Sequence, residues 1–104
     1  SASNLFIVKD QQLITPPKSH HLLPGITRDL VLELAIKEGI SCIEQEISEQ
    51  QLFDADEIWL TSSTKEIMPV AKLNRQAVGN GQPGNLWQQV STSYSQFKNQ
   101  LRNQ

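Results

Sequence analysis

The segment from Ile26 to Glu38 constrains the fold more than any other part of the sequence, because it has the spacing of a helix that is apolar on more than one side. Gly39 follows it, at the place where a left-handed residue commonly ends a helix. A helix with apolar residues on more than one side is expected to pack against more than one neighbour, as a helix that covers a sheet does. The apolar positions are Ile26, Leu30, Val31, Leu32, Leu34, Ala35 and Ile36.

Segments with strand composition lie on both sides of this helix. The first pair forms a predicted hairpin, with a polar turn in the middle and Pro16 and Pro17 at its end. Pro69 places the last predicted strand at an edge or a bulge, because proline has no backbone N–H for a ladder. The expected strands are residues 5–15 (as the hairpin), 40–47, 57–61 and 66–73, and turns or irregular structure are expected at 74–76 and 79–84.

Two more helices complete the expected fold. Ser48 and Gln51 have the spacing of a capping box and predict a short helix over 48–53. Residues 85–101 predict an amphipathic terminal helix with core contacts at Leu86, Val90, Tyr94, Phe97 and Leu101. The sequence therefore predicts a single mixed α/β domain over residues 1–104, with one sheet covered by two main helices. The pattern leaves the strand order open.

Composition excludes several classes of function. Nine basic and eleven acidic residues give a formal charge of −2 without a long block of either sign, so a footprint for nucleic acid or an anionic membrane is lacking. No apolar run approaches the roughly 20 residues of a membrane-spanning helix, and we expect a cytoplasmic protein. Cys42 is expected to fill apolar space, and the adjacent His20 and His21 lack further ligands at metal-binding spacing.

Two short motifs carry the chemistry. Residues 23–28, Leu-Pro-Gly-Ile-Thr-Arg, open the long helix, and residues 61–64, Thr-Ser-Ser-Thr, follow an apolar strand. A helix start leaves amide donors unpaired and carries the positive end of the macrodipole, so hydroxyls beside it suit a phosphate group. Each motif alone is also consistent with hydroxyls that cap their own backbone and bind no ligand.

In order and spacing, these motifs resemble the C-terminal part of the fold-type IV pyridoxal-phosphate enzymes, the family of D-amino-acid and branched-chain aminotransferases. The resemblance covers nearly the whole chain. It is strengthened by residues 1–6, by the approach at 53–58, by Met68-Pro69-Val70 and by the entry to the last helix at 81–84. It implies the C-terminal domain of the D-amino-acid aminotransferase-like fold, with pyridoxal 5'-phosphate as cofactor.

The resemblance also implies roles for single residues. The backbone amides of Ile26 and Thr27 and the Thr27 hydroxyl would hold the cofactor phosphate, and Ser62 and Ser63 would complete the cup. Leu23 would pack on the pyridine ring, and Ser3 would lie on a strand that passes the cofactor. Arg28 is interpreted as structural, a guanidinium that bonds neighbouring loops.

Three groups that the family uses are absent from the sequence given: the Schiff-base lysine, a glutamate at the pyridine nitrogen and an arginine from the smaller domain. The chain begins without methionine and directly on a strand, which suggests part of a larger enzyme, a homodimer when full length. This segment by itself, without the N-terminal part, is expected to be inactive.

The member of the family is a finer prediction. The motifs favour a D-alanine aminotransferase, which exchanges an amino group between an amino acid and a 2-oxo acid. A branched-chain aminotransferase and an aminodeoxychorismate lyase are the alternatives within the family. An alternative of another class is a non-catalytic domain that binds a phosphate ligand or another subunit.

Overall fold

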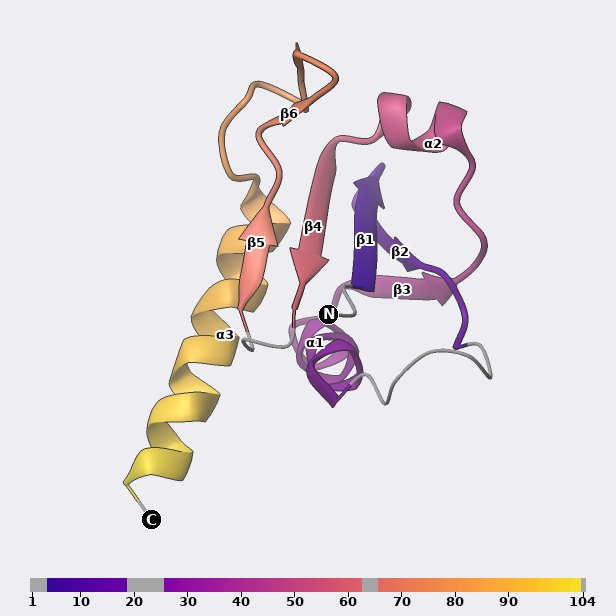
Figure 1. Ribbon diagram of the computed structural model, residues 1–104. Helices are drawn as coiled ribbons and strands as arrows, with labels where there is room; N and C mark the ends of the chain where they lie inside the picture. Colours follow the sequence, from indigo (N-terminus) through magenta and orange to yellow (C-terminus); the bar gives the residue numbers. More distant parts are fainter. Residues whose placement is uncertain (1–3, 19–25, 63–65, 104) are drawn as a thin grey trace.

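The computed structural model describes residues 4–18, 26–62 and 66–103, and of Ile26 it describes only the backbone. Two helices lie beside a twisted sheet, and a short helix and a small hairpin lie at its other end (Figure 1). The mixed α/β class that the sequence predicted is therefore confirmed. The elements in chain order are β1 (Asn4–Lys9), β2 (Gln12–Thr15), α1 (Ile26–Lys37), β3 (Ser41–Glu44), α2 (Glu49–Asp54), β4 (Glu57–Thr61), β5 (Ile67–Pro69), β6 (Lys72–Leu73), β7 (Gln76–Ala77) and α3 (Asn85–Arg102).

The main sheet has the order β3-β2-β1-β4-β5. Strands β1 and β2 form the predicted antiparallel hairpin, and its two turn residues, Asp10 and Gln11, both have positive φ, as a tight two-residue turn requires. Strand β3 runs parallel to β2 because α1 crosses between them. Strand β5 is an edge, in agreement with the expectation from Pro69.

Two predicted strands are shorter than expected. The strand expected at 40–47 ends at Glu44, because β2, its partner, ends at Thr15 before two prolines, and Gln45 makes the last bond, to the Thr15 carbonyl. The strand expected at 66–73 is broken after Pro69. Its remainder turns away to form the separate hairpin of β6 and β7, which the sequence did not predict.

The core has two layers. The first, between the sheet and the pair α1 and α3, contains Phe6, Leu13 and Trp59 among its largest members. The second lies on the opposite face, around Ile7 and Ile58, where parts of α2 and of β6 close it. One sheet covered by two main helices is thus confirmed, and both of these helices lie on the same face (Figure 1).

Each main helix exposes one apolar residue that its amphipathic pattern would place in the core. Helix α1 contacts both α3 and β3, as its breadth predicted, although Ile36 is 63% exposed. It ends at Lys37, and Gly39, whose φ is +81°, follows two residues later. In α3, Leu101 is 53% exposed, so the prediction that it is a core residue is wrong. The physical reason is that the C-terminal half of α3 extends past the sheet (Figure 1).

Candidate phosphate-binding site

The start of α1 is the first half of the predicted site. Helix α1 begins at Ile26, so Ile26 and Thr27 occupy its first turn, where backbone N–H groups have no acceptor within the helix. Asp29 in the same turn is paired with Lys18 at 2.8 Å, and this hydrogen bond is the main cause that lowers the pKa of Asp29. Lys18 thus partly neutralises the one acidic side chain of the first turn, where backbone donors of the kind that bind anions are found.

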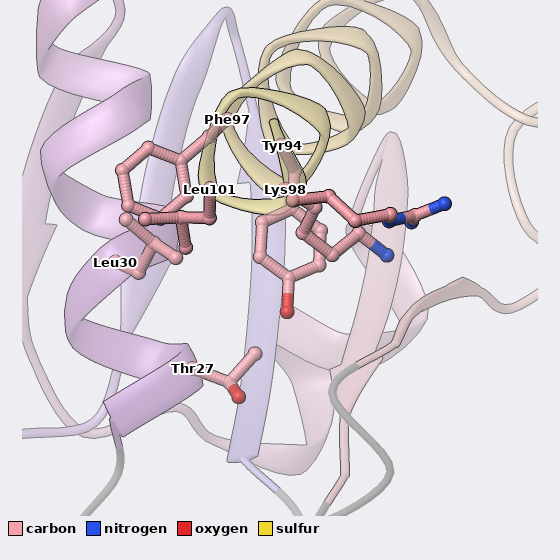
Figure 2. A pocket seen from close by; sticks show the side chains of 7 residues that line it. Thr27, Leu30, Tyr94, Phe97, Lys98 and Leu101 are labelled. Atoms are coloured by element: carbon pink, nitrogen blue, oxygen red, sulfur yellow. The ribbon is translucent and has the colours of Figure 1, made fainter. Parts of the chain in front are cut away.

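Tyr94 of α3 lies beside Thr27 of α1, and both line one opening between the two helices. Figure 2 shows the Tyr94 hydroxyl directed toward the start of α1, where Thr27 lies. Tyr94 is only 5% exposed. Burial raises the pKa of its phenol, the Thr27 hydroxyl acts in the opposite direction, and the Glu66 carboxylate raises the pKa further.

The end of β4, where the second half of the predicted site begins, is related to Tyr94 by packing. Glu66 follows the predicted Thr-Ser-Ser-Thr bend, and its neighbour Ile67 pairs with Thr61, the last residue of β4. Tyr94 lies beside Thr27 and packs in the same core layer as Ile67. The start of α1 and the end of β4, far apart in sequence, therefore lie on the same side of the sheet near one buried phenol.

The predicted site residues differ in how far the structure describes them. Thr27 is half-buried at the start of α1, and Ser62 is half-buried directly after β4. Ser3, Leu23 and Ser63 lie outside the described residues, as do His20 and His21. For Ile26, the structure describes only the backbone, which lies at the start of α1. Their cofactor-binding roles remain predictions.

Sequence reasoning did not select Thr61 as a site residue. Thr61 is 1% exposed, and its hydroxyl has no hydrogen-bond partner among the residues that the structure describes. A buried hydroxyl without a partner costs folding free energy, on the order of 1–3 kcal/mol in proteins. The strand alternation alone could have placed Thr61 on the same face as Trp59, but nothing in the sequence showed that its hydroxyl lacks a partner.

Arg28 is structural, as the sequence interpretation proposed. Its side chain is 4% exposed and donates to the Pro16 carbonyl at 2.9 Å, to Glu44 at 2.8 Å and to Asp29 at 3.0 Å. It therefore ties the start of α1 to the ends of β2 and β3.

The start of α3 is already occupied by a side chain. The Glu57 carboxylate accepts hydrogen bonds from the backbone of Leu86 at 3.2 Å and of Trp87 at 3.0 Å, and from Trp59 Nε1 at 2.9 Å. Gly84 makes this approach possible, since a Cβ there would lie 2.0 Å from Glu57 Cδ. Two motifs that carried the resemblance, at 53–58 and 81–84, thus meet to cap a helix.

A pocket of about 480 Å³ opens between α1 and α3 beside the Thr27–Tyr94 pair. Leu30, Phe97 and Leu101 form its apolar side, and the Lys98 ammonium lies 4.6 Å from the centre of the Tyr94 ring (Figure 2). Phe97 and Leu101 therefore line a surface opening, where the sequence predicted core contacts.

Other candidate chemistry is weaker. Cys42 is half-buried, its Sγ lies 3.4 Å from the Ile40 carbonyl oxygen, and burial raises the pKa of its thiol, which disfavours a reactive thiolate.

Within residues 4–18, 26–62 and 66–103, no group of three or more His, Cys, Asp or Glu side chains could hold a metal ion. In the same ranges, no helix has the length and apolarity to cross a membrane.

Comparison with known proteins agrees with this arrangement. Residues 1–73 match the model of the family "Amino-transferase class IV". The D-alanine aminotransferase of Bacillus licheniformis is 36% identical over 89% of this chain and 33% of its own length. The crystal structure of the Escherichia coli branched-chain amino acid aminotransferase has a TM-score of 0.85 and 38% identity, and the match covers 90% of this chain and 32% of that one.

A branched-chain aminotransferase from Thermobaculum terrenum, solved in its PLP form, has a TM-score of 0.84 and 32% identity over 91% of this chain and 31% of that one. The chain thus spans about a third of the proteins it matches. The similar identities to D-alanine and branched-chain enzymes do not favour the D-alanine enzyme that the sequence motifs suggested. The family match and the shared fold show that this chain belongs to the class IV aminotransferases.

Proposed function

We propose that this chain is the C-terminal, cofactor-binding part of an aminotransferase that uses pyridoxal 5'-phosphate. In this proposal, the amides of Ile26 and Thr27 and the Thr27 hydroxyl hold the cofactor phosphate together with Ser62 and Ser63. The observation that carries it is the buried Tyr94 phenol, which is directed toward the start of α1 (Figure 2) and packs in the same core layer as Ile67. Ile67 pairs with Thr61, the residue before Ser62, so Tyr94 lies between the start of α1 and the end of β4.

The donor set fits a phosphate ester. A helix start supplies amide donors and a favourable dipole, and the Thr27 and Ser62 hydroxyls add neutral donors without the cost of burying further charge. The Thr61 hydroxyl, at the same end of the sheet, makes no hydrogen bond to any residue that the structure describes, so it is a further polar group that a ligand could satisfy. A ligand with several acceptor oxygens is the chemical complement of such a set.

When bound, the cofactor supplies a ring that accepts the electron pair released at the substrate's α-carbon. The residues of this chain would anchor and orient the phosphate, so that the ring stays in place while substrate groups exchange. The proton-transferring lysine and the residues that contact the pyridine nitrogen belong to the N-terminal part of the enzyme in this proposal. We therefore expect the segment alone to bind phosphate ligands without turnover.

The substrates of the complete enzyme would be an amino acid and a 2-oxo acid. We retain D-alanine as the proposed amino donor, on the motifs at 25–28 and 61–70, with a branched-chain amino acid or an aminodeoxychorismate lyase activity as alternatives. A homodimer and a cytoplasmic location are parts of the same proposal. Amino transfer to 2-oxoglutarate from D-alanine and from L-leucine, measured with the enzyme that contains this chain, distinguishes the two aminotransferases.

Binding of pyridoxine 5'-phosphate tests the phosphate site directly. This probe has no aldehyde and cannot react with surface lysines, and pyridoxine is its matched control without the phosphate. We expect the chain to prefer the phosphorylated probe, and Thr27→Val to weaken that binding about tenfold, the loss of roughly one charge-assisted hydrogen bond. Thr92→Val, on the exposed surface of α3, is the control substitution. Equal affinity for both probes would exclude the proposed site.

A further inference from the structure

We propose that the Thr61 hydroxyl is an additional binding group for the phosphate, beyond the residues that the family resemblance supplies. This inference rests on the proposed function. Its starting point is the burial of Thr61, which is 1% exposed, with a hydroxyl that has no partner in the described part of the chain. Valine has nearly the same shape and would fill the same space without a polar group.

The contrast with Thr15 shows what is unusual about Thr61. Thr15 is also 1% exposed and also lies at the end of a strand. Its hydroxyl donates to the Leu5 carbonyl at 2.6 Å, so it is satisfied inside the folded chain. The hydroxyl of Thr61 is buried as deeply and has no partner among residues 4–18, 26–62 and 66–103, which points to a partner from outside this part of the chain.

The strand geometry places Thr61 on the side of the candidate site. Side chains alternate along a strand, so Thr61 projects from the same face as Trp59, whose side chain packs in the core layer of α1 and α3. Exposed Leu60 projects from the other face. Thr61 is therefore turned toward the helices that carry Thr27 and Tyr94.

Neighbouring contacts narrow the location further. Thr61 pairs across the sheet with Ile67, which packs in the same core layer as Tyr94. Tyr94 in turn lies beside Thr27, and its hydroxyl is directed toward the start of α1 (Figure 2). Thr61 also directly precedes Ser62. The hydroxyl thus lies on the side of the sheet that carries the start of α1.

A hydroxyl suits this position chemically. It can donate its proton to a phosphate oxygen while remaining neutral, so it adds a bond without the desolvation cost of a buried cation. In the absence of the anion, the same hydroxyl lowers the stability of the fold. This inference therefore predicts opposite effects of one substitution on stability and on ligand affinity.

The test compares Thr61→Val with Thr15→Val by thermal unfolding and by titration with pyridoxine 5'-phosphate. We expect Thr61→Val to raise the melting temperature by about 4–8 °C and to weaken binding about tenfold. Thr15→Val should lower the melting temperature by a similar amount and change the affinity less than twofold. Thr61→Ser keeps the hydroxyl and should keep the affinity within about threefold of the original chain.

Two results would overturn the inference. A melting temperature that falls in Thr61→Val, as in Thr15→Val, would show that the hydroxyl is bonded within the folded chain. Unchanged affinity in Thr61→Val, while Thr27→Val loses binding, would remove Thr61 from the site and leave the proposed function intact. If the original chain does not prefer the phosphorylated probe over pyridoxine, the proposed function fails, and this inference fails with it.

Discussion

Replacement of Gly84 by alanine tests how the last helix is held to the sheet. Gly84 has φ −82° and ψ 174°, an extended conformation that alanine adopts without strain. In a position of this kind, the backbone effect alone would make alanine stabilising by about 0.4–1 kcal/mol, because the unfolded chain becomes less flexible. A loss of stability would therefore have to come from contacts with other residues.

The structure identifies that contact as the Glu57 side chain. A Cβ at position 84 would lie 2.0 Å from Glu57 Cδ and 2.3 Å from one of its carboxylate oxygens, so the carboxylate must move. Movement breaks the bonds to the backbone of Leu86 and Trp87, and it leaves the buried Trp59 Nε1 without its acceptor.

These losses set the size of the effect. Removal of a helix cap costs about 0.5–2 kcal/mol, and a buried indole N–H without an acceptor costs about 1–3 kcal/mol. After subtraction of the backbone gain, we expect Gly84→Ala to lower the free energy of unfolding by about 1–4 kcal/mol. The predicted sign is opposite to that of the backbone effect alone.

Urea unfolding, followed by tryptophan fluorescence and by circular dichroism, measures the free energy of unfolding. The effect of Gly84→Ala is measured once in the original chain and once in the Glu57→Ala variant. The decisive variant combines both substitutions. Without the Glu57 carboxylate there is nothing for the new methyl group to displace, so Gly84→Ala should then be neutral or stabilising. An equal loss in both backgrounds would refute the reasoning, because the cause would then lie elsewhere than in the Glu57 cap.

Three other predictions follow from the same structure. Tyr94→Phe removes the hydroxyl that is directed toward the start of α1 beside Thr27, and we expect binding of pyridoxine 5'-phosphate, followed by titration, to weaken about two- to fivefold while far-ultraviolet circular dichroism stays unchanged. Arg28→Lys keeps the charge but cannot reach the same set of partners, so urea unfolding should show a loss of about 1–3 kcal/mol. Burial raises the pKa of Cys42 and Tyr94 above the ordinary 9.0 and 10.0, so the folded chain retains protons that the unfolded chain releases. Stability should therefore fall as pH rises above about 9, and Cys42→Ala should reduce the first part of that slope in melts across an alkaline pH series.

Local features of the fold could be predicted from the sequence because their determinants are close together. The Ser48–Gln51 capping box is one example, with both of its hydrogen bonds present, and the hairpin turn at Asp10 and Gln11 is another. The order of strands could not be predicted, since it depends on which apolar faces meet. Gly84 illustrates the same limit, because its role exists only where Glu57 comes near it.

In the candidate site too, some residues could be predicted from the sequence and others could be identified only from the structure. The helix start at Thr27 could be predicted from a short motif, whereas its neighbour Tyr94 was interpreted only as a core residue of the last helix. The hydroxyl of Thr61 could be recognised only from the structure, since the sequence does not show whether a buried hydroxyl has a partner. Hydrogen bonds between distant segments are not encoded in any local pattern.

The contacts that hold the helices also explain how a phosphate site would stay in shape before it binds a ligand. Arg28 fixes the first turn of α1 to the ends of β2 and β3, and Glu57 fixes the start of α3 to β4. Thr27 and Tyr94 lie beside each other where the two helices meet. Because each helix is anchored independently, the Thr27 hydroxyl and the end of β4 have little freedom relative to one another. Gly84→Ala should therefore weaken phosphate binding less than Tyr94→Phe does, although it removes more stability, since it leaves the Tyr94 hydroxyl in place beside Thr27.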